Sequence, residues 1–264
     1  MSSTTGTGAA TAHVLEVDGL IVRYGARTAV DGVTFQVRRG EVFGLLGPNG
    51  AGKTSTLSAI EGLLTPQGGS VVVDGIDVQR NPTAARARLG VQLQASSFQA
   101  ELTIEEIARL YAGLYGLRVT KQVIADRIRD IGLGDELGKR FKALSGGQQQ
   151  RLSLLIAVIH QPVLLLLDEP TSGLDPQSRR QLWDRMETLR TDGGSIVLTT
   201  HSMEEAQAVC DRVAIIDHGK LLVVDTPVEL IAKHSDDPRV LKVARGEVTL
   251  EDVFIGLTGS DIRD

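Results

Sequence analysis

A chain of 264 residues is long enough to bury a substantial core, as one large domain or as a domain with a subdomain. A hydrophobic content of 42% and a charged content of 23% are ordinary for a soluble globular protein, and the net charge of -5 argues against a broad electrostatic affinity for nucleic acid. The single cysteine, Cys210, excludes an internal disulfide framework and a metal site built from several cysteines.

The amino-terminal segment, residues 1–12, is rich in serine, threonine, glycine and alanine, and we expect a disordered tail there. It contains neither a basic region nor an apolar signal segment. Apolar runs elsewhere in the sequence are well short of the roughly 18 residues that a membrane span requires. These features predict a cytoplasmic chain.

Antiparallel strands are predicted next, because apolar residues alternate over residues 14–17 and 33–37, and residues 20–24 form a further strand pattern after a glycine. Tyr24 ends the second of these strands, just before Gly25. An aromatic residue at such a position is more often a packing or turn residue. In a chain with only 3% aromatics, it is alternatively a platform on which adenine stacks.

A glycine-rich loop follows a buried strand at residues 41–46 and precedes a helix predicted over residues 53–62. The loop matches the phosphate-loop pattern G-x-x-x-x-G-K-[ST]. Glycines allow backbone N–H groups to curl around a phosphate, and the helix start adds unpaired donors and a positive dipole end. The loop consists of Gly47, Pro48, Asn49, Gly50, Ala51, Gly52, Lys53, Thr54 and Ser55.

Two side chains of this loop carry specific chemistry. Lys53 is expected to reach the β- and γ-phosphates of a nucleotide, and Thr54 to offer its hydroxyl to Mg²⁺. Chance alone would produce the pattern in about one chain in a hundred of this length. The sequence therefore predicts a nucleoside triphosphate site.

A helical insertion is predicted in the middle of the chain. Strand patterns at residues 71–75 and 89–94, with a short helical piece at 83–88, give way to helical periodicity after Thr103. Thr103 and Glu106 form a capping-box pattern, and a second helical pattern covers residues 123–131. We expect a helical subdomain over about residues 96–162, inserted in an α/β core.

Another glycine pair occurs in the stretch Ser145, Gly146, Gly147 and Gln148. Ser145 and Gln148 match a capping box, which is a purely structural role. The same helix start offers free N–H groups to a second phosphate. The two interpretations are about equally supported at this point.

An unbroken apolar run at residues 163–167 predicts a strand buried on both faces of a parallel sheet. Asp168 and Glu169 follow it, at the strand end where open α/β sheets bind ligands. Asp168 suits Mg²⁺ coordination, directly or through water, and Glu169 suits positioning and deprotonating an attacking water.

The remaining elements complete the core. Asp175 precedes Pro176 and is expected to cap a helix, while a buried strand at residues 195–200 delivers His201 to its carboxyl end. A strand–turn–strand pattern at 212–224 and a helix from Pro227 follow. Residues 232–245 are mixed and charged and predict a linker, and residues 248–257 predict a short amphipathic ending.

Taken as an ordered set, these motifs resemble those of the ATP-binding cassette (ABC) family of transporter ATPases. The loop at 47–55 is similar to the Walker A loop, residues 144–148 to the family signature, and residues 164–169 to Walker B with its catalytic glutamate. Asp175 is similar to the D-loop aspartate, His201 to the switch histidine, and Tyr24 to the adenine-stacking aromatic. The resemblance implies a phosphate-loop α/β core, an amino-terminal antiparallel β subdomain and an inserted helical subdomain, within a domain spanning residues 13–231 and followed by a linker and extension at 232–264.

The resemblance also implies a mechanism that uses ATP and Mg²⁺. Two cassettes, expected to be identical chains, meet head to tail, and each ATP lies between one chain's Walker A loop and the other's signature, so that Ser145 faces the partner's γ-phosphate. The glutamine that links γ-phosphate and Mg²⁺ to the membrane partner is assigned to Gln94, with Gln92 as the competing choice.

Separate transmembrane permease subunits are the implied partners. They would dock near residues 94–103 on a protein held peripherally at the inner face of the membrane. The tail at residues 248–259 resembles the bacterial drug, antibiotic and lipid exporter branch. An importer ATPase is the nearest alternative, followed by a soluble ABC ATPase acting on ribosomes or DNA, and by an unrelated phosphate-loop kinase.

Overall fold

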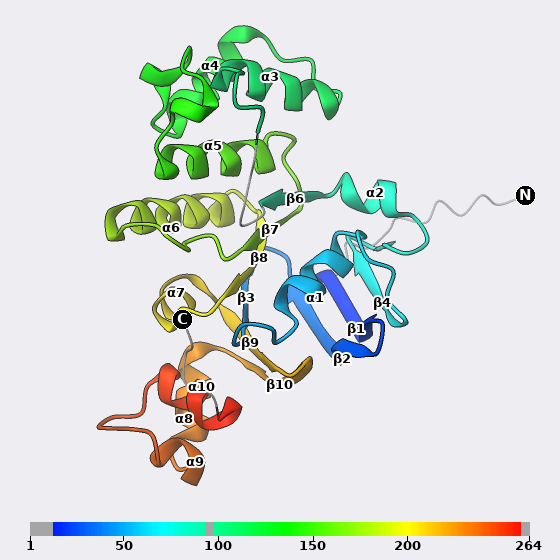
Figure 1. Cartoon of the computed structure of the whole chain (residues 1–264), viewed down its shortest axis with the longest axis vertical. Helices are drawn as coiled ribbons and strands as arrows, with labels where there is room; N and C mark the ends of the chain where they lie inside the picture. Colours follow the sequence, from blue (N-terminus) through cyan, green and yellow to red (C-terminus); the bar gives the residue numbers. More distant parts are fainter. Residues whose placement is uncertain (1–12, 93–97, 260–264) are drawn as a thin grey trace, which may run out of the picture.

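The computed structural model describes residues 13–92 and 98–259. In this part of the chain, a four-stranded antiparallel sheet (β2-β1-β4-β5) lies beside a six-stranded sheet (β10-β9-β3-β8-β7-β6) (Figure 1). The strands are β1 (His13–Tyr24), β2 (Arg27–Arg38), β3 (Val42–Leu46), β4 (Gly68–Val73), β5 (Ile76–Asp77), β6 (Leu89–Gln92), β7 (Leu164–Asp168), β8 (Ser195–Thr200), β9 (Arg212–Asp217) and β10 (Lys220–Asp225).

Helices connect these strands and cover them. The α-helices are α1 (Lys53–Ile60), α2 (Pro82–Arg86), α3 (Ile104–Leu114), α4 (Lys121–Asp130), α5 (Gly146–Val158), α6 (Pro176–Thr191), α7 (Met203–Val209), α8 (Pro227–His234), α9 (Pro238–Leu241) and α10 (Leu250–Thr258). Two 3₁₀ turns, η1 (Gly134–Glu136) and η2 (Phe141–Ala143), precede α5. None of the helices in residues 13–92 and 98–259 combines the length and apolar character that crossing a membrane demands.

The first strand is longer than the alternation predicts. Residues 14–17 and 20–24 belong to one strand, β1, which pairs with β2 along its length. Where the sequence predicts a break between two strands, the pairing of β1 with β2 only shifts in register, between Val17 and Leu20, and Gly19 has a φ of 56°. A glycine adopts this left-handed backbone without a Cβ penalty, so the strand absorbs the irregularity as a bulge and continues.

The six-stranded sheet is parallel except for β10, which pairs antiparallel with β9. Every residue of β3, β7 and β8 is buried. These strands lack polar alternation because both faces of the sheet are covered. Their carboxyl ends meet at one edge, which brings residues 47, 169 and 201 to the same part of the molecule.

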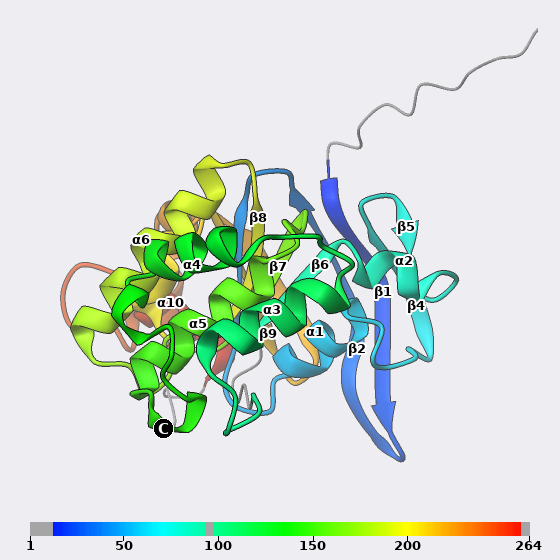
Figure 2. The same ribbon diagram turned by 90° about the horizontal axis from the view of Figure 1, so that it is seen from above.

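Two hydrophobic cores flank this sheet. One lies toward α1 and the antiparallel sheet and includes Leu57 and Leu166. The other lies toward α6, α7 and the carboxyl-terminal helices and includes Leu182 and Phe254. Figure 2 shows the antiparallel sheet on one side of the six-stranded sheet and α6 on the other. The predicted α/β fold with an antiparallel β subdomain is confirmed.

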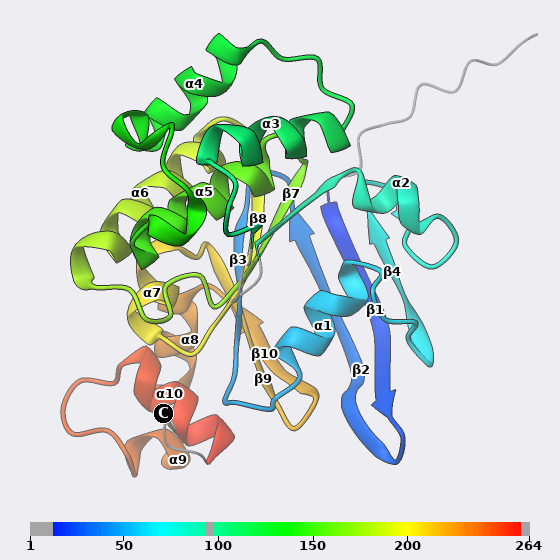
Figure 3. The same ribbon diagram turned by 45° about the horizontal axis from the view of Figure 1, so that its top comes forward.

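The predicted helical insertion has a third core of its own. It is built from α3, α4 and α5, with Ile107, Ile128 and Leu155 among its buried residues. Thr103 caps α3 in a complete capping box, as its pattern predicts. Figure 3 shows α3 and α4 lying beyond α5, away from β1 and β2. The boundaries proposed for the subdomain and for the whole domain stay predictions.

The linker predicted at residues 232–245 is wrong in part. The end of α8 and all of α9 lie within it, and Asp237 caps α9 by accepting a hydrogen bond from the Arg239 N–H. Val240 of α9 is fully buried, and a Cβ on Gly256 of α10 would lie 2.9 Å from the Val240 Cα. The segment is therefore packed against α10. Residues 1–12, predicted to be a tail, lie outside the described residues.

Candidate active site

The phosphate loop turns tightly between β3 and α1. Gly50 and Gly52 have φ angles of 83° and 107°, which only glycine adopts easily. Backbone also approaches closely: a Cβ on Gly47 would lie 2.3 Å from the Ile216 carbonyl oxygen, and one on Gly52 would lie 2.4 Å from that of Ala29. The glycines of the motif are therefore required by the folded loop itself, in addition to any ligand.

Lys53 lies inside this loop and is 5% exposed. Its Nζ donates hydrogen bonds to the carbonyl oxygens of Gly47, at 2.7 Å, and Pro48, at 3.3 Å, and lies 3.7 Å from Glu169 Oε1. Burial lowers the pKa of the Lys53 ammonium, although Glu169 and Asp168 oppose the shift. The lysine is thus a buried cation directed to the place where β3, α1 and β7 converge.

Asp168, at the carboxyl end of β7, is held by two hydroxyl groups. Thr54 Oγ1 lies 3.2 Å from Asp168 Oδ2, and Thr199 Oγ1 donates to Asp168 Oδ1 at 2.5 Å. The side chains of Thr54 and Asp168 therefore bring a hydroxyl and a carboxylate together beside the phosphate loop. Oxygen donors of this kind suit Mg²⁺, which binds proteins through one or two carboxylates and the substrate's phosphates.

Glu169 has an unusual backbone. Its φ is 47°, and its N–H donates to the Thr199 hydroxyl at 2.9 Å and to the Thr199 carbonyl at 3.2 Å. Its carboxylate lies between two basic groups, because Oε1 is 3.7 Å from Lys53 Nζ and Oε2 is 3.5 Å from His201 Nδ1. The side chain of His201 is 44% exposed. The structure therefore brings together the three residues predicted to be catalytic.

A cavity of about 440 Å³ is bordered by Lys53, Thr54 and Glu169, whereas Asp168 and His201 are not among its lining residues. Tyr24 is 51% exposed at its edge, and its hydroxyl lies 3.4 Å from Ser55 Oγ. The lining residues are Tyr24, Arg27, Ala29, Asn49, Gly50, Gly52, Lys53, Thr54, Ser55 and Glu169. Arg27 was not anticipated from the sequence, since an arginine at the start of a strand, here β2, matches no motif.

The signature residues do not line this cavity. Ser145 caps α5 in the predicted capping box, in which Ser145 Oγ accepts from the Gln148 N–H and Gln148 Oε1 accepts from the Ser145 N–H. Asp175 caps α6, and hydrogen bonds from Ser178 lower the pKa of its carboxyl. Ser145, Gly146 and Asp175 are exposed. The structural roles predicted for Ser145 and Asp175 are therefore confirmed.

Of the two glutamines considered for the link to the membrane partner, Gln92 lies within the described residues. Gln94 lies outside the described residues. Gln92 ends β6, is 2% exposed, and has no hydrogen-bond partner for either side-chain amide atom within the part of the chain that the structure describes. Gln92 is thus a buried strand residue and is not among the residues lining the cavity.

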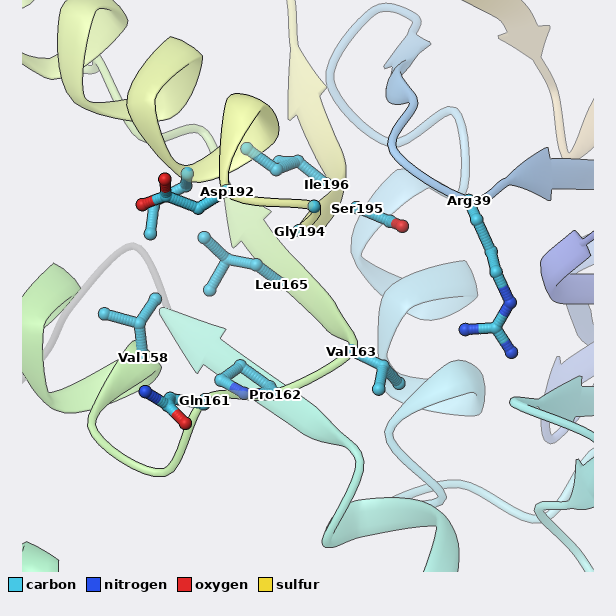
Figure 4. A pocket seen from close by; sticks show the side chains of 12 residues that line it. Arg39, Val158, Gln161, Pro162, Val163, Leu165, Asp192, Gly194, Ser195 and Ile196 are labelled. Carbon is cyan, nitrogen blue, oxygen red and sulfur yellow. The ribbon is translucent and has the colours of Figure 1, made fainter. Parts of the chain in front are cut away.

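A second cavity, of about 470 Å³, lies at the opposite edge of the sheet (Figure 4). It is bordered by residues at the amino-terminal ends of β7 and β8, including Val163 and Ser195, and by Arg39. Figure 4 shows both apolar and polar side chains around it, whereas Asp168 ends β7 and Glu169 follows at the opposite, carboxyl end of that strand. This cavity is therefore separate from the predicted nucleotide site.

The comparisons with known proteins agree with these observations. Residues 30–172 match the family model described as ABC transporter. Over 228 residues, the chain is 39% identical to the Nod factor export ATP-binding protein I of Ralstonia nicotianae, covering 86% of this chain and 71% of that protein. It is 34% identical to the linearmycin resistance ATP-binding protein LnrL of Bacillus subtilis, covering 85% and 73%. It spans only 41% of the probable multidrug ABC transporter ATP-binding protein YbhF of Escherichia coli, at 38% identity over 92% of this chain.

Solved structures give the same result. The structure of an ATP-binding subunit of an ABC transporter superimposes with a TM-score of 0.81 at 30% identity, covering 92% of this chain and 99% of that one. An ATP-binding cassette of an ABC transporter in its ADP conformation, at 21% identity and a TM-score of 0.77, supports the fold alone. The chain therefore belongs to the ABC transporter family, as one of its ATP-binding, ATP-hydrolysing proteins.

Proposed function

We propose that this chain is the ATP-hydrolysing subunit of an exporter of a drug, antibiotic, lipid or similar compound, working with separate transmembrane subunits. The observation that carries the proposal is the convergence of Lys53, Asp168 and Glu169 beside the phosphate loop. The direction of transport is supported by relatives named for Nod factor export and linearmycin resistance.

Binding of ATP would use the groups around the cavity. The loop amides and Lys53 hold the β- and γ-phosphates, and adenine stacks on the exposed ring of Tyr24. Thr54 and Asp168 hold Mg²⁺, with Gln94 as the further ligand that the family resemblance implies. When bound, Mg²⁺ supplies neutralisation of the charge that develops on the transferred phosphoryl group.

Hydrolysis would depend on Glu169 and His201. Glu169 accepts a hydrogen bond from the attacking water, orients it toward the γ-phosphate and takes up its proton. His201, 3.5 Å from the Glu169 carboxylate, is placed to hold that side chain and the γ-phosphate in register. Lys53 remains paired with the developing negative charge.

A second copy of the chain would complete each site. Ser145, Gly146, Gly147 and Gln148 stand at a helix start outside the cavity of their own chain, and the first two are exposed. Free N–H groups at a helix start bind anions. We therefore propose that two chains meet head to tail, with Ser145 and Asp175 of each directed to the ATP held by the other.

The transmembrane subunits would dock on the helical subdomain and on residues 94–103, at the cytoplasmic face of the membrane. Co-expression with a permease from a neighbouring reading frame that encodes several membrane spans tests the proposal. We expect the two proteins to co-purify from solubilised membranes. The compound should leave cells, and should accumulate inside inverted vesicles supplied with external ATP, only when both proteins are present. Recovery of no membrane protein, or ATP-dependent uptake into cells instead of efflux, would contradict it, the latter in favour of an importer.

A further inference from the structure

We propose that Thr199 is a positioning residue of the ATPase site, which orients the carboxylates of Asp168 and Glu169 through one hydroxyl group. Thr199 lies near the carboxyl end of β8 and is fully buried. It does not line the cavity, so it acts through its two neighbours rather than on the nucleotide. The proposal rests on the roles proposed above for Asp168 and Glu169.

The directions of the two hydrogen bonds follow from the chemistry of the groups. The Glu169 backbone N–H, 2.9 Å from Thr199 Oγ1, is a donor only, so the hydroxyl oxygen accepts from it. The single hydroxyl hydrogen is then left for Asp168 Oδ1, at 2.5 Å. Because the Thr199 hydroxyl both accepts and donates a hydrogen bond, it restricts the orientation of the Glu169 backbone and of the Asp168 carboxylate. The rest of the Thr199 side chain is buried in β8.

The bond to Asp168 fixes the orientation of a carboxylate whose Oδ2 and Oδ1 lie 3.2 Å and 3.5 Å from Thr54 Oγ1. Oδ1 accepts from Thr199 inside the protein, while Oδ2 lies 3.2 Å from Thr54 Oγ1, the other proposed Mg²⁺ ligand. Rotation of the carboxylate would break one of these contacts. Hydrogen bonds to a metal-ligating group fix its orientation and typically change metal affinity or activity by roughly 10–100-fold.

The bond to Glu169 holds a backbone conformation that this residue rarely adopts. A φ of 47° is uncommon for any residue other than glycine and persists only where the surroundings enforce it. Both the hydroxyl and the carbonyl of Thr199 accept from the Glu169 N–H. This conformation directs the Glu169 carboxylate to the space between Lys53 and His201.

Three variants separate positioning from packing. Thr199→Val keeps the shape and removes the hydroxyl, whereas Thr199→Ser keeps the hydroxyl and removes a methyl group. Ser195→Ala removes another buried hydroxyl from the same strand at its far end, where Ser195 accepts from the Gly40 N–H at 2.9 Å. Circular dichroism first establishes that each variant is folded.

Binding of a fluorescent ATP analogue, titrated with Mg²⁺ and repeated in EDTA, is the primary readout, and kcat is the second. We expect Thr199→Val to raise the half-maximal Mg²⁺ concentration by roughly 10–100-fold, with binding in EDTA unchanged. kcat of Thr199→Val should fall at saturating Mg²⁺, because the strained Glu169 backbone loses an anchor. Thr199→Ser and Ser195→Ala should keep the wild-type Mg²⁺ dependence.

A Thr199→Val protein with the wild-type Mg²⁺ dependence and kcat would overturn the proposal, and so would a Thr199→Ser protein as impaired as Thr199→Val. If Thr199→Val does not fold, Thr199→Cys takes its place, since a thiol is only a weak donor and acceptor. A wild-type protein that binds and hydrolyses ATP without regard to Mg²⁺ would instead contradict the proposed metal site itself.

Discussion

Lys53 is held by carbonyl oxygens of the loop to which it belongs, so its truncation removes a brace of the loop as well as a cation. We expect Lys53→Ala to weaken ATP binding and to lower the hydrolysis rate by at least about 10²–10³, the usual effect of losing one preorganised charge-stabilising group. Steady-state ATPase assays of the purified protein provide the measurement, with Lys121→Ala, an exposed lysine of α4, as the control. Near-normal turnover in Lys53→Ala would contradict the role proposed for this residue.

Glu61, directly after α1, is a buried carboxyl group outside the catalytic set. It is 5% exposed, and burial, reinforced by the charge of Asp168 and opposed by that of Arg86, raises its pKa from 4.5 to about 7. Between these two pH values the folded protein holds a proton that the unfolded chain has released. The free energy of unfolding therefore falls as pH rises through this window, by roughly 3 kcal/mol from this group.

The variant Glu61→Gln should lose this pH dependence, because glutamine is neutral throughout. We expect its stability to fall less than that of the wild type between pH 5.5 and pH 8, as measured by urea denaturation at about these pH values. Glu251→Gln, at an exposed position in α10, is the matched control. Parallel pH profiles for Glu61→Gln and the wild type would show that Glu61 does not titrate in this range.

At the scale of elements, the contact of α10 with α9 depends on one glycine. A Cβ on Gly256 would lie 2.7 Å from Val240 Cγ2, 2.9 Å from its Cα and 3.0 Å from its N, and two of these are backbone atoms that cannot move aside cheaply. Gly113 of α3 has no atom within 4 Å of an added Cβ. The same glycine-to-alanine change therefore places a methyl group in open space in α3 and against the Val240 backbone in α10.

We expect Gly113→Ala to raise the free energy of unfolding by up to about 1 kcal/mol, through helix propensity. Gly256→Ala gains the same term but adds an overpacking cost of about 1–3 kcal/mol, which gives a net loss of up to about 2 kcal/mol. Urea denaturation of both variants measures the difference. If Gly256→Ala proves as stable as Gly113→Ala, α10 does not pack on α9 as described.

Elements were predictable where a local signal determines them. The capping boxes at Thr103 and Ser145 and the unbroken apolar strand β7 each follow from a few adjacent residues, and each is confirmed. The packing of residues 232–245 was not predictable, because burial of Val240 depends on contact with α10, which no local pattern records. The continuity of β1 across Gly19 likewise depends on pairing with β2.

The candidate site shows the same division. Sequence spacing identified the residues that carry charge, because a phosphate loop and a strand ending in two acids are local patterns. It did not identify Arg27 at the cavity or Thr199 behind Asp168, since both reach the site through tertiary folding. Residues 145–148 were identified by pattern, and the family resemblance implied that they act on a partner's ATP; in the structure they do not line their own chain's cavity.

For the whole molecule, the proposed head-to-tail dimer is tested by Glu169→Gln. Glutamine keeps the shape of the side chain but cannot accept a proton, so we expect hydrolysis to slow by about 10²–10⁴ while ATP binding survives. ATP should then hold two chains together. Size-exclusion chromatography of the variant, with and without Mg²⁺ and ATP, is expected to show a dimer only when both are present.

Two results would contradict this expectation in different ways. A monomer under both conditions, with ATP binding demonstrated separately, would mean that the working partner is a different cassette chain. Wild-type hydrolysis rates in Glu169→Gln would mean that another residue accepts the proton. A Glu187→Gln control, at an exposed glutamate of α6, guards against a general effect of the substitution.

Helix α5 contributes side chains to two hydrophobic cores, with Leu154 and Ala157 packed toward the six-stranded sheet and α6, and Leu155 and Ile156 packed toward α3 and α4. Unfolding of either core would expose the apolar side chains on one face of α5 to water. The helical insertion and the α/β core are therefore joined thermodynamically into one cooperative unit, whose loss of order spreads from either side through α5. Ser145 caps the amino terminus of this shared helix, so a force applied at Ser145 is transmitted through α5 to both cores.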